Sequence, residues 1–220
     1  MVDISDNITQ ILTNALSGDK ETRQDSEKKL EQKALGNFPE FLYELGQQLS
    51  DESKPIKIRQ LAATYIKNSI VRSDNLREIW LNKIDPNAKE QIKRLVLSTL
   101  ATSFKEVRAA AGIVIAGICK VDLPLQEKWP ELISSLCQNS YHENINISLA
   151  AIESLGYLCE ELTLKTIDTV SIDSILSALI TNLSGKLNNL DIVKSCLKAL
   201  FHTIRLAEKN FSREVTIYSY

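Results

Sequence analysis

The stretch Ile58-Arg-Gln-Leu-Ala-Ala-Thr-Tyr-Ile-Lys-Asn-Ser-Ile70 decides the fold of this 220-residue chain. Counting from Arg59, the residues Ala62, Ile66 and Ser69 follow at steps that place them on one face of an α-helix. The same offsets recur from four further anchors, and mostly small residues stand three positions after the anchor. The anchors are Arg23, Arg108, Ser148 and Lys194, followed by Ser26, Ala111, Ala151 and Leu197. The pattern predicts repeated helices that neighbouring helices can approach closely.

A second helix is predicted before each of these. The candidates are Ile8–Leu16, Pro39–Leu49, Pro86–Leu100, Pro130–Leu136 and Ser174–Leu183. Three of them begin at a proline, which suits the first position of a helix. Short polar links such as Ser17-Gly18-Asp19 indicate turns between antiparallel helices. We call the first helix of each pair A and the second B.

The anchors lie 36 to 49 residues apart, in the range of HEAT and armadillo repeats. We therefore predict an all-α fold, a HEAT-repeat α-solenoid in which antiparallel A/B hairpins form a right-handed superhelix. The long connection from Val71 to Asp85 holds Trp80 and Leu81, and we expect it to pack against the repeats. The predicted repeats are 1–36, 37–84, 85–122, 123–164 and 165–211, with 212–220 as the start of a sixth A helix that is cut short near Tyr218 and Tyr220.

Composition argues against several classes of function. The net charge of −2 provides no positive field for nucleic acid, and no apolar run reaches the ~18 residues of a membrane span. The four cysteines form no Cys-x-x-Cys pair, so we expect reduced thiols and no metal site. His142 and His202 are far apart, and no nucleophile or nucleotide motif is present. We predict neither a cofactor nor an enzyme.

A series of local motifs carries a family resemblance. They are Asn37-Phe-Pro-Glu-Phe-Leu, Ala62-Ala-Thr-Tyr-Ile-Lys-Asn68, Ile84-Asp-Pro-Asn-Ala88, Lys128-Trp-Pro-Glu-Leu-Ile133 and Ala151-Ile-Glu-Ser-Leu-Gly-Tyr-Leu-Cys159. In this order and spacing they resemble the N-terminal region of the importin-β (karyopherin-β) nuclear transport receptors, over nearly the whole chain. Asp25 departs from the pattern, since the family usually has a small residue there.

The resemblance implies a function and a set of partners. Receptors of this family carry cargo through nuclear pores, so the chain is expected in the cytoplasm, the nucleus and the nuclear envelope. Their N-terminal B helices bind the GTPase Ran in its GTP form, and their outer A helices bind the Phe-Gly repeats of nucleoporins. Importin-α and cargo bind in further repeats that are missing here.

The resemblance matches the pair Lys67-Asn68 to the Ran-contacting region of the family. Polar residues of neighbouring B helices are further candidates for the same partner: Glu27, Lys28 and Glu31 on the first, and Arg108 at the head of the third. Each also has a structural alternative. Lys67 and the charges of the first B helix could simply be solvated, and Asn68 could bond the backbone. Arg59 and Arg108 share one repeat position, which favours a structural role between repeats.

The candidate nucleoporin contacts lie on the fifth A helix. Leu176, Ser177 and Ile180 resemble the positions that receive a Phe side chain, and Leu176 and Ile180 are four apart on one helix face. The opposite wall would come from the sixth A helix. The alternative is an ordinary core face. Trp129, before Pro130 at a predicted helix start, is read as a packing anchor.

Three other functions remain open at this point. The chain could be a structural HEAT scaffold of the phosphatase-regulatory or coat-adaptor type. It could be a helical domain associated with an enzyme, or another karyopherin with different cargo. Preference for the GTP form of Ran would separate a transport receptor from the structural scaffold, and an active-site constellation in further repeats would support the enzyme-associated domain.

Overall fold

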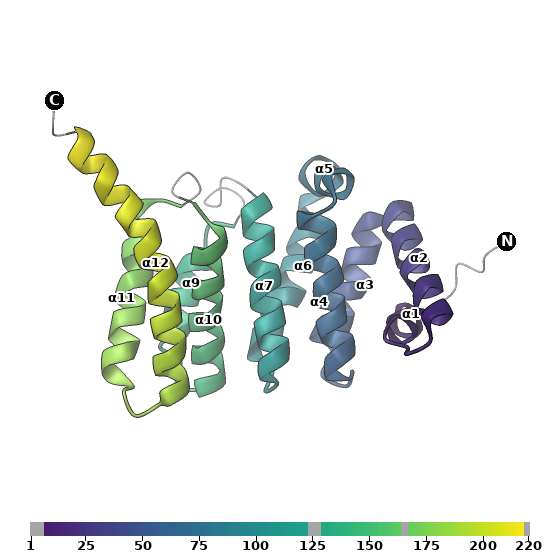
Figure 1. Ribbon diagram of the computed structural model, residues 1–220, viewed down its shortest axis with the longest axis horizontal. Helices are drawn as coiled ribbons and strands as arrows, with labels where there is room; N and C mark the ends of the chain where they lie inside the picture. Colours follow the sequence, from purple (N-terminus) through teal and green to yellow (C-terminus); the bar gives the residue numbers. More distant parts are fainter. Residues whose placement is uncertain (1–6, 123–128, 164–166, 218–220) are drawn as a thin grey trace. The chain divides into compact units, whose positions relative to one another are not determined.

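The computed structural model describes residues 7–122, 129–163 and 167–217, with side chains up to residue 207. Every regular element in these ranges is a helix, so the all-α prediction is confirmed for them (Figure 1). The chain divides into two compact units between Val114 and Ile115, within α7. The first unit holds α1 (Ile8–Ala15), α2 (Lys20–Gly36), α3 (Phe38–Ser50), α4 (Ile56–Val71), α5 (Asp74–Asn82), α6 (Pro86–Ser98), the 3-10 turn η1 (Thr99–Ala101) and the start of α7 (Lys105–Val121). The second holds the rest of α7, α9 (Leu132–Asn139), α10 (Ile145–Glu161), α11 (Thr169–Gly185) and α12 (Leu190–Ile217).

Helix caps explain where the helices of the first unit begin. The Asp19 carboxylate accepts from the Thr22 amide at 2.8 Å, and Asp85 accepts from the Asn87 amide at 2.8 Å. Pro39 and Pro86 occupy the first turns of α3 and α6, as the sequence predicts. The apolar faces then meet in a core of fully buried side chains. The largest apolar ones are Trp80, Phe41, Leu12, Leu30, Leu42, Leu45, Leu49, Ile66, Ile70 and Ile92.

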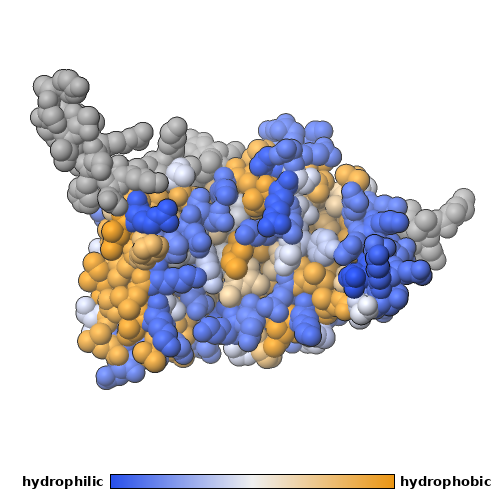
Figure 2. All heavy atoms as spheres, in the orientation of Figure 1, coloured by the Kyte–Doolittle hydropathy of each residue, from blue (hydrophilic) through white to orange (hydrophobic). Residues whose placement is uncertain are grey.

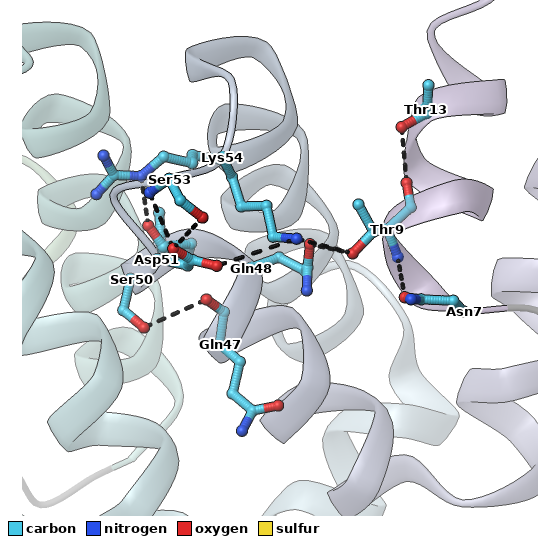
Figure 3. A network of polar contacts seen from close by, with 11 residues as sticks. Asn7, Thr9, Thr13, Gln47, Gln48, Ser50, Asp51, Ser53 and Lys54 are labelled. Carbon is cyan, nitrogen blue, oxygen red and sulfur yellow. Dashed lines mark hydrogen bonds and ion pairs between the residues drawn. The ribbon is translucent and has the colours of Figure 1, made fainter.

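A polar network joins the first hairpin to the second (Figure 3). The Thr9 hydroxyl of α1 donates to Gln48 Oε1 of α3 at 2.8 Å and lies 3.5 Å from Lys54 Nζ. Asp51 accepts from the amide and hydroxyl of Ser53, and these hydrogen bonds lower the pKa of its carboxyl. The network ties α1 to the turn that leads into α4.

The connection between the second and third hairpins is itself helical. The sequence predicts a packed connection over residues 71–85, whereas the structure places the helix α5 there, capped by the Ser73 hydroxyl. Trp80 is fully buried, as predicted, and Lys89 Nζ lies 5.4 Å from the centroid of its ring. Leu81 differs from the expectation, because 37% of its surface is exposed.

In the second unit, α10 packs closely against α12. A Cβ added to Gly156 would lie 3.2 Å from the Ala199 Cβ and 3.3 Å from its Cα, so the absence of a side chain permits this approach. Trp129 is 8% exposed, in keeping with its predicted packing role.

A buried polar cluster links α9, α10 and α11 in the same unit. The Ser148 hydroxyl donates to the Ser140 carbonyl at 2.6 Å, and the Asn182 amide donates to the Ser140 hydroxyl at 3.0 Å. Lys186 Nζ donates to the Ser148 hydroxyl at 3.0 Å. Ser148 stands at the repeat position that Arg59 and Arg108 occupy in the first unit, so the two units fill this position with different chemistry.

The predicted register of the fifth B helix is wrong by one residue. Counting from Lys194 predicts a buried face through Leu197, Phe201 and Ile204, yet these three are 54%, 61% and 55% exposed. Counting from Val193 instead gives Cys196 and Thr203, which are fully buried. A shift of one residue turns a helix face by about 100°. In Figure 2, hydrophobic side chains accordingly gather on the surface over α11 and α12.

The last predicted element also differs. Residues 212–217 continue α12 and do not begin a sixth A helix. Tyr218 and Tyr220 lie outside the described residues. The other A and B helices occur in the predicted order, while the repeat boundaries remain predictions.

Three properties of the described ranges bear on function. None of their helices is long and apolar enough to cross a bilayer. They contain no cluster of three or more His, Cys, Asp or Glu side chains suited to a metal ion. The four cysteines are free thiols.

Candidate functional site

The first unit contains a groove between α4 and the first ten residues of α7, which we call the α4/α7 groove. The two helices run side by side in the same direction (Figure 1). The groove has a volume of about 490 Å³. Its lining residues are Gln60, Ala63, Thr64, Lys67, Asn68 and Arg72 from α4 and its C-cap, and Glu106, Ala109, Ala110, Ile113 and Val114 from α7.

Arg59 fixes α4 beside the segment that leads into α7. Its side chain is fully buried, Nε donates to the Leu49 carbonyl at 2.8 Å, and Nη1 donates to the Thr102 hydroxyl at 3.2 Å. The guanidinium carbon also lies 6.0 Å from the centroid of the Phe104 ring. Burial lowers the pKa of this guanidinium, whereas Glu52 and Asp51 oppose that shift. Arg59 thus connects the second and third hairpins.

Arg108 is also buried, but its hydrogen bonds stay within its own hairpin. It is 4% exposed, and its Nη1 donates to the carbonyls of Thr102 and Ser103, each at 2.9 Å. Its side chain does not line the α4/α7 groove. These contacts give Arg108 a structural role within the third hairpin, whereas its role between repeats and its contact with Ran both remain predictions.

Small side chains form the floor of the groove. Ala63 and Val114 are 2% and 1% exposed, and Ala109 and Ala110 are half-buried. Alanine carries nothing beyond Cβ, so a ligand can reach down between the two helices. The groove therefore offers apolar contact at its base.

Charged and polar side chains form the rim. Lys67, Asn68 and Arg72 lie toward the C-terminal end of α4, and Glu106 lies at the N-terminus of α7. Within the described part of the chain, Lys67, Arg72 and Glu106 make no ion pair. These charges are consequently available to a partner.

The structure brings two of the six predicted Ran contacts into this groove, Lys67 and Asn68. Glu27, Lys28 and Glu31 are exposed on α2 and do not line it. Glu27 lies near Tyr65 of α4, where burial first and this carboxylate second raise the tyrosine pKa. The three α2 residues remain predictions for a wider contact surface.

Sequence reasoning missed the remaining residues that line the groove. Gln60, Thr64 and Lys67 follow steps of four and three, so a second face of α4 was visible beside the buried one. Glu106 could not be found in this way, because its place opposite α4 depends on the packing of two hairpins.

The predicted nucleoporin residues lie on one side of α11. Leu176 is half-buried, Ser177 is exposed, and Ile180 is 53% exposed. A separate groove of about 200 Å³ lies between α9 and α11, and we call it the α9/α11 groove. Its lining residues are Trp129, Pro130, Ile133, Ser134, Val170, Ser171 and Ser174. The three predicted residues do not line this second groove.

Comparison with known proteins gives consistent matches. Residues 26–102 match the family model of the importin-beta N-terminal domain. The chain is 32% identical over 213 residues to importin subunit beta-1 of Arabidopsis thaliana, covering 94% of this chain and 24% of that protein.

Solved structures agree with the sequence matches. The fold is similar to that of Kap95p in a solved structure with RanGDP. In that structure, binding of Kap95p induces the switch loops of RanGDP to adopt the GTP-bound conformation. The TM-score is 0.81 at 29% identity, covering 94% of this chain and 24% of Kap95p. A Kap95:Nup1 complex gives the same TM-score of 0.81 at 29% identity, with 94% and 25% covered. The chain thus spans about a quarter of the length of these relatives.

Proposed function

This chain belongs to the importin-β family, and from that premise we propose that it acts in nuclear import by binding the GTPase Ran, in its GTP form, through the α4/α7 groove. The family assignment also confirms the predicted HEAT class of its hairpins. The observation that carries the Ran proposal is the placement of Lys67 and Asn68 on the rim of an open groove with unpaired charges.

The relative Kap95p supports the choice of nucleotide state. Kap95p induces the switch loops of RanGDP to adopt the GTP-bound conformation. When a partner must change its conformation in order to be bound, the free energy of that change is taken from the free energy of binding and the affinity falls. A chain with the same binding mode binds Ran more tightly when the bound GTP already holds the switch loops in place.

A titration tests the proposal directly. Ran loaded with GTP and Ran loaded with GDP are each titrated into the chain, and the two dissociation constants are compared. Lys67→Glu should weaken the GTP-form complex about tenfold, because it places a like charge where an acidic partner group is expected. Lys57→Glu is the matched control, since Lys57 is exposed in the first turn of α4 and does not line the groove.

Two results would count against this function. Equal affinity for the two nucleotide forms would favour the structural HEAT scaffold that the sequence left open. An equal effect of Lys67→Glu and Lys57→Glu would move the Ran site away from the groove.

A second proposed partner is a Phe-Gly nucleoporin, bound on α11. Val170 of the α9/α11 groove is 74% exposed and Ile180 on the other predicted surface is 53% exposed, so α11 presents two apolar surfaces. Burial of one Phe ring contributes about 2 kcal/mol, so each contact is weak and the binding depends on many repeats. The Kap95:Nup1 complex supports a nucleoporin as partner.

Variants distinguish the two surfaces of α11. Binding of a polypeptide with several Phe-Gly repeats is measured for Val170→Ser and for Ile180→Ser. Loss in Ile180→Ser alone supports the site predicted from the resemblance, and loss in Val170→Ser alone supports the α9/α11 groove. If both variants bind like the parent chain, nucleoporin binding does not involve α11.

The remaining features of the proposal follow from the family. Importin-β proteins are transport receptors and not enzymes, and we propose that this chain works in the cytoplasm, in the nucleus and at the pore. Importin-α and cargo would contact repeats beyond the five predicted here. Another karyopherin with different cargo remains the alternative within the family.

A further inference from the structure

We infer that the α4/α7 groove is a bipolar site that binds one segment of the GTPase in a fixed direction. The segment presents an acidic side chain to Lys67 and Arg72, a small apolar side chain to the alanine floor, and a basic side chain to Glu106. The inference rests on the proposed function and assigns the chemistry of its partner.

The two charged ends of the groove are well separated. Because α4 and α7 run in the same direction, Glu106 at the start of α7 lies at the end of the groove where Gln60 lies. Lys67 and Arg72 lie seven and twelve residues after Gln60, which corresponds to about 10 Å and about 18 Å along a helix. Both separations exceed the screening length of about 8 Å at physiological salt, so salt weakens the coupling between the two ends.

The charges at both ends lack partners within the described residues. Neighbouring surface charges of the same unit behave differently: Lys33 pairs with Glu44 at 3.0 Å and Arg94 pairs with Glu90 at 3.0 Å. A segment that covers Lys67, Arg72 and Glu106 removes water from them, and this is unfavourable unless it supplies opposite charges. Complementary charge therefore selects both the partner and its direction.

The floor restricts the middle of the segment. Ala63, Ala109 and Ala110 leave the space between the helices open, and Ile113 and Val114 make it apolar. An apolar side chain there gains contact without losing a hydrogen bond. A charged side chain at that point has no group of opposite charge among the floor residues.

Charge reversal at each end tests the bipolar arrangement. The variants are Glu106→Lys, the pair Lys67→Glu with Arg72→Glu, and the control Lys57→Glu. Each of the first two should weaken binding of GTP-loaded Ran about tenfold and make the affinity less dependent on salt, whereas the control stays within about twofold. Urea unfolding of each variant is measured in parallel, because these charges also complement the dipoles of their helices.

Crosslinking then identifies the direction of the segment. A photoreactive benzoylphenylalanine replaces Gln60 in one variant and Asn68 in another, and mass spectrometry locates the Ran residues that each captures. We expect a basic residue near the Gln60 crosslink and an acidic residue near the Asn68 crosslink. Reversing that acidic residue of Ran should restore binding to the Lys67→Glu/Arg72→Glu variant but not to Glu106→Lys.

The outcomes distinguish a failure of the bipolar groove from a failure of the proposed function. If the parent chain prefers GTP-loaded Ran but both reversals bind within twofold of it, the bipolar groove is wrong and the proposed function stands. If the crosslinks show the opposite charges at the two ends, the direction is wrong. If the parent chain binds both nucleotide forms equally, the proposed function fails and the inference fails with it.

Discussion

The B-helix pairs of the two units differ in how far they leave a groove open. The α4/α7 groove of the first unit has a volume of about 490 Å³, whereas the groove between α10 and α12 in the second unit, the α10/α12 groove, has about 150 Å³. Both are formed by B helices of consecutive predicted repeats. Repeat position alone therefore does not determine whether a groove can receive a partner.

Side-chain pairing accounts for the difference. In the α10/α12 groove, Lys198 Nζ lies 5.2 Å from the centroid of the Tyr157 ring, and the Ser195 hydroxyl lies 3.4 Å from Glu153 Oε1. Gly156 lets the two helices approach closely. In the α4/α7 groove the charged rim residues find no such partners in the described chain. Intramolecular pairing fills one groove, and its absence leaves the other open to a ligand.

The largest predicted effect of a single substitution concerns the support of the open groove. Arg59→Ala leaves the Leu49 carbonyl and the Thr102 hydroxyl unpaired in a buried site and creates a cavity. We expect a loss of about 3 kcal/mol in the free energy of unfolding, measured with urea. Arg94→Ala removes an exposed charge pair and should cost less than about 0.5 kcal/mol. A loss below about 1 kcal/mol for Arg59→Ala would mean that this residue does not support the groove.

Replacing a small residue with leucine should destabilise the protein at the α10/α12 groove and leave its stability nearly unchanged at the α4/α7 groove. Gly156→Leu forces a side chain against the backbone of Ala199, and we expect a loss of about 2 kcal/mol in unfolding free energy. Ala109→Leu extends into the open α4/α7 groove and should change that free energy by less than about 0.5 kcal/mol, while weakening Ran binding. Urea unfolding of both variants makes the comparison. Similar losses in both would show that the open groove closes in solution.

Alkaline pH should destabilise the second unit before the first. Burial raises the pKa values of Cys137, Cys159 and Cys196 to about 11 from 9.0. Between those values the unfolded chain loses thiol protons that the folded chain keeps, so stability falls as pH rises, by up to about 1.4 kcal/mol per pH unit for each thiol. Residues 1–114 contain no cysteine, and Tyr65 there has its pKa raised from 10.0.

Hydrogen exchange between pH 8 and 10 measures this difference, after correction for the intrinsic exchange rate. Protection should fall in α9, α10, α11 and α12 and hold in the helices from α1 to α6. Cys159→Ala should make the decline of the second unit less steep. Equal decline of both units from pH 9 would show that the thiols are not responsible.

The smallest predicted effect concerns the residue that covers the closed groove. Lys198→Met removes the cation over the Tyr157 ring, an interaction worth about 0.5 kcal/mol at an exposed site. A double-mutant cycle with Tyr157→Leu isolates the pairwise energy from the other effects of each change. A coupling energy near zero would leave the approach at Gly156 as the sole cause of the smaller volume.

Periodicity was sufficient to predict most helices and to place Lys67 and Asn68 on an accessible face. It failed for α12, because apolar residues occur on two faces of that helix and Leu197, Phe201 and Ile204 match the pattern while exposed. It also missed α5, a short helix without a repeat partner. The groove itself depends on the distance between helices of different hairpins, which a pattern along one helix does not contain.

The buried cluster at Ser140 has a consequence for the order of synthesis. In the first unit, Arg59 donates to the hydroxyl of Thr102, so the earlier hairpin supplies the donor. At Ser140 the direction is reversed, because Asn182 and Lys186 supply the donors from the later hairpin. A ribosome releases the chain from its N-terminus. The α9–α10 hairpin therefore emerges with the Ser148 hydroxyl as its own donor to Ser140. The chain must then extend from Glu161, the last residue of α10, to Asn182 and Lys186 before this part of the nascent protein can complete its polar contacts.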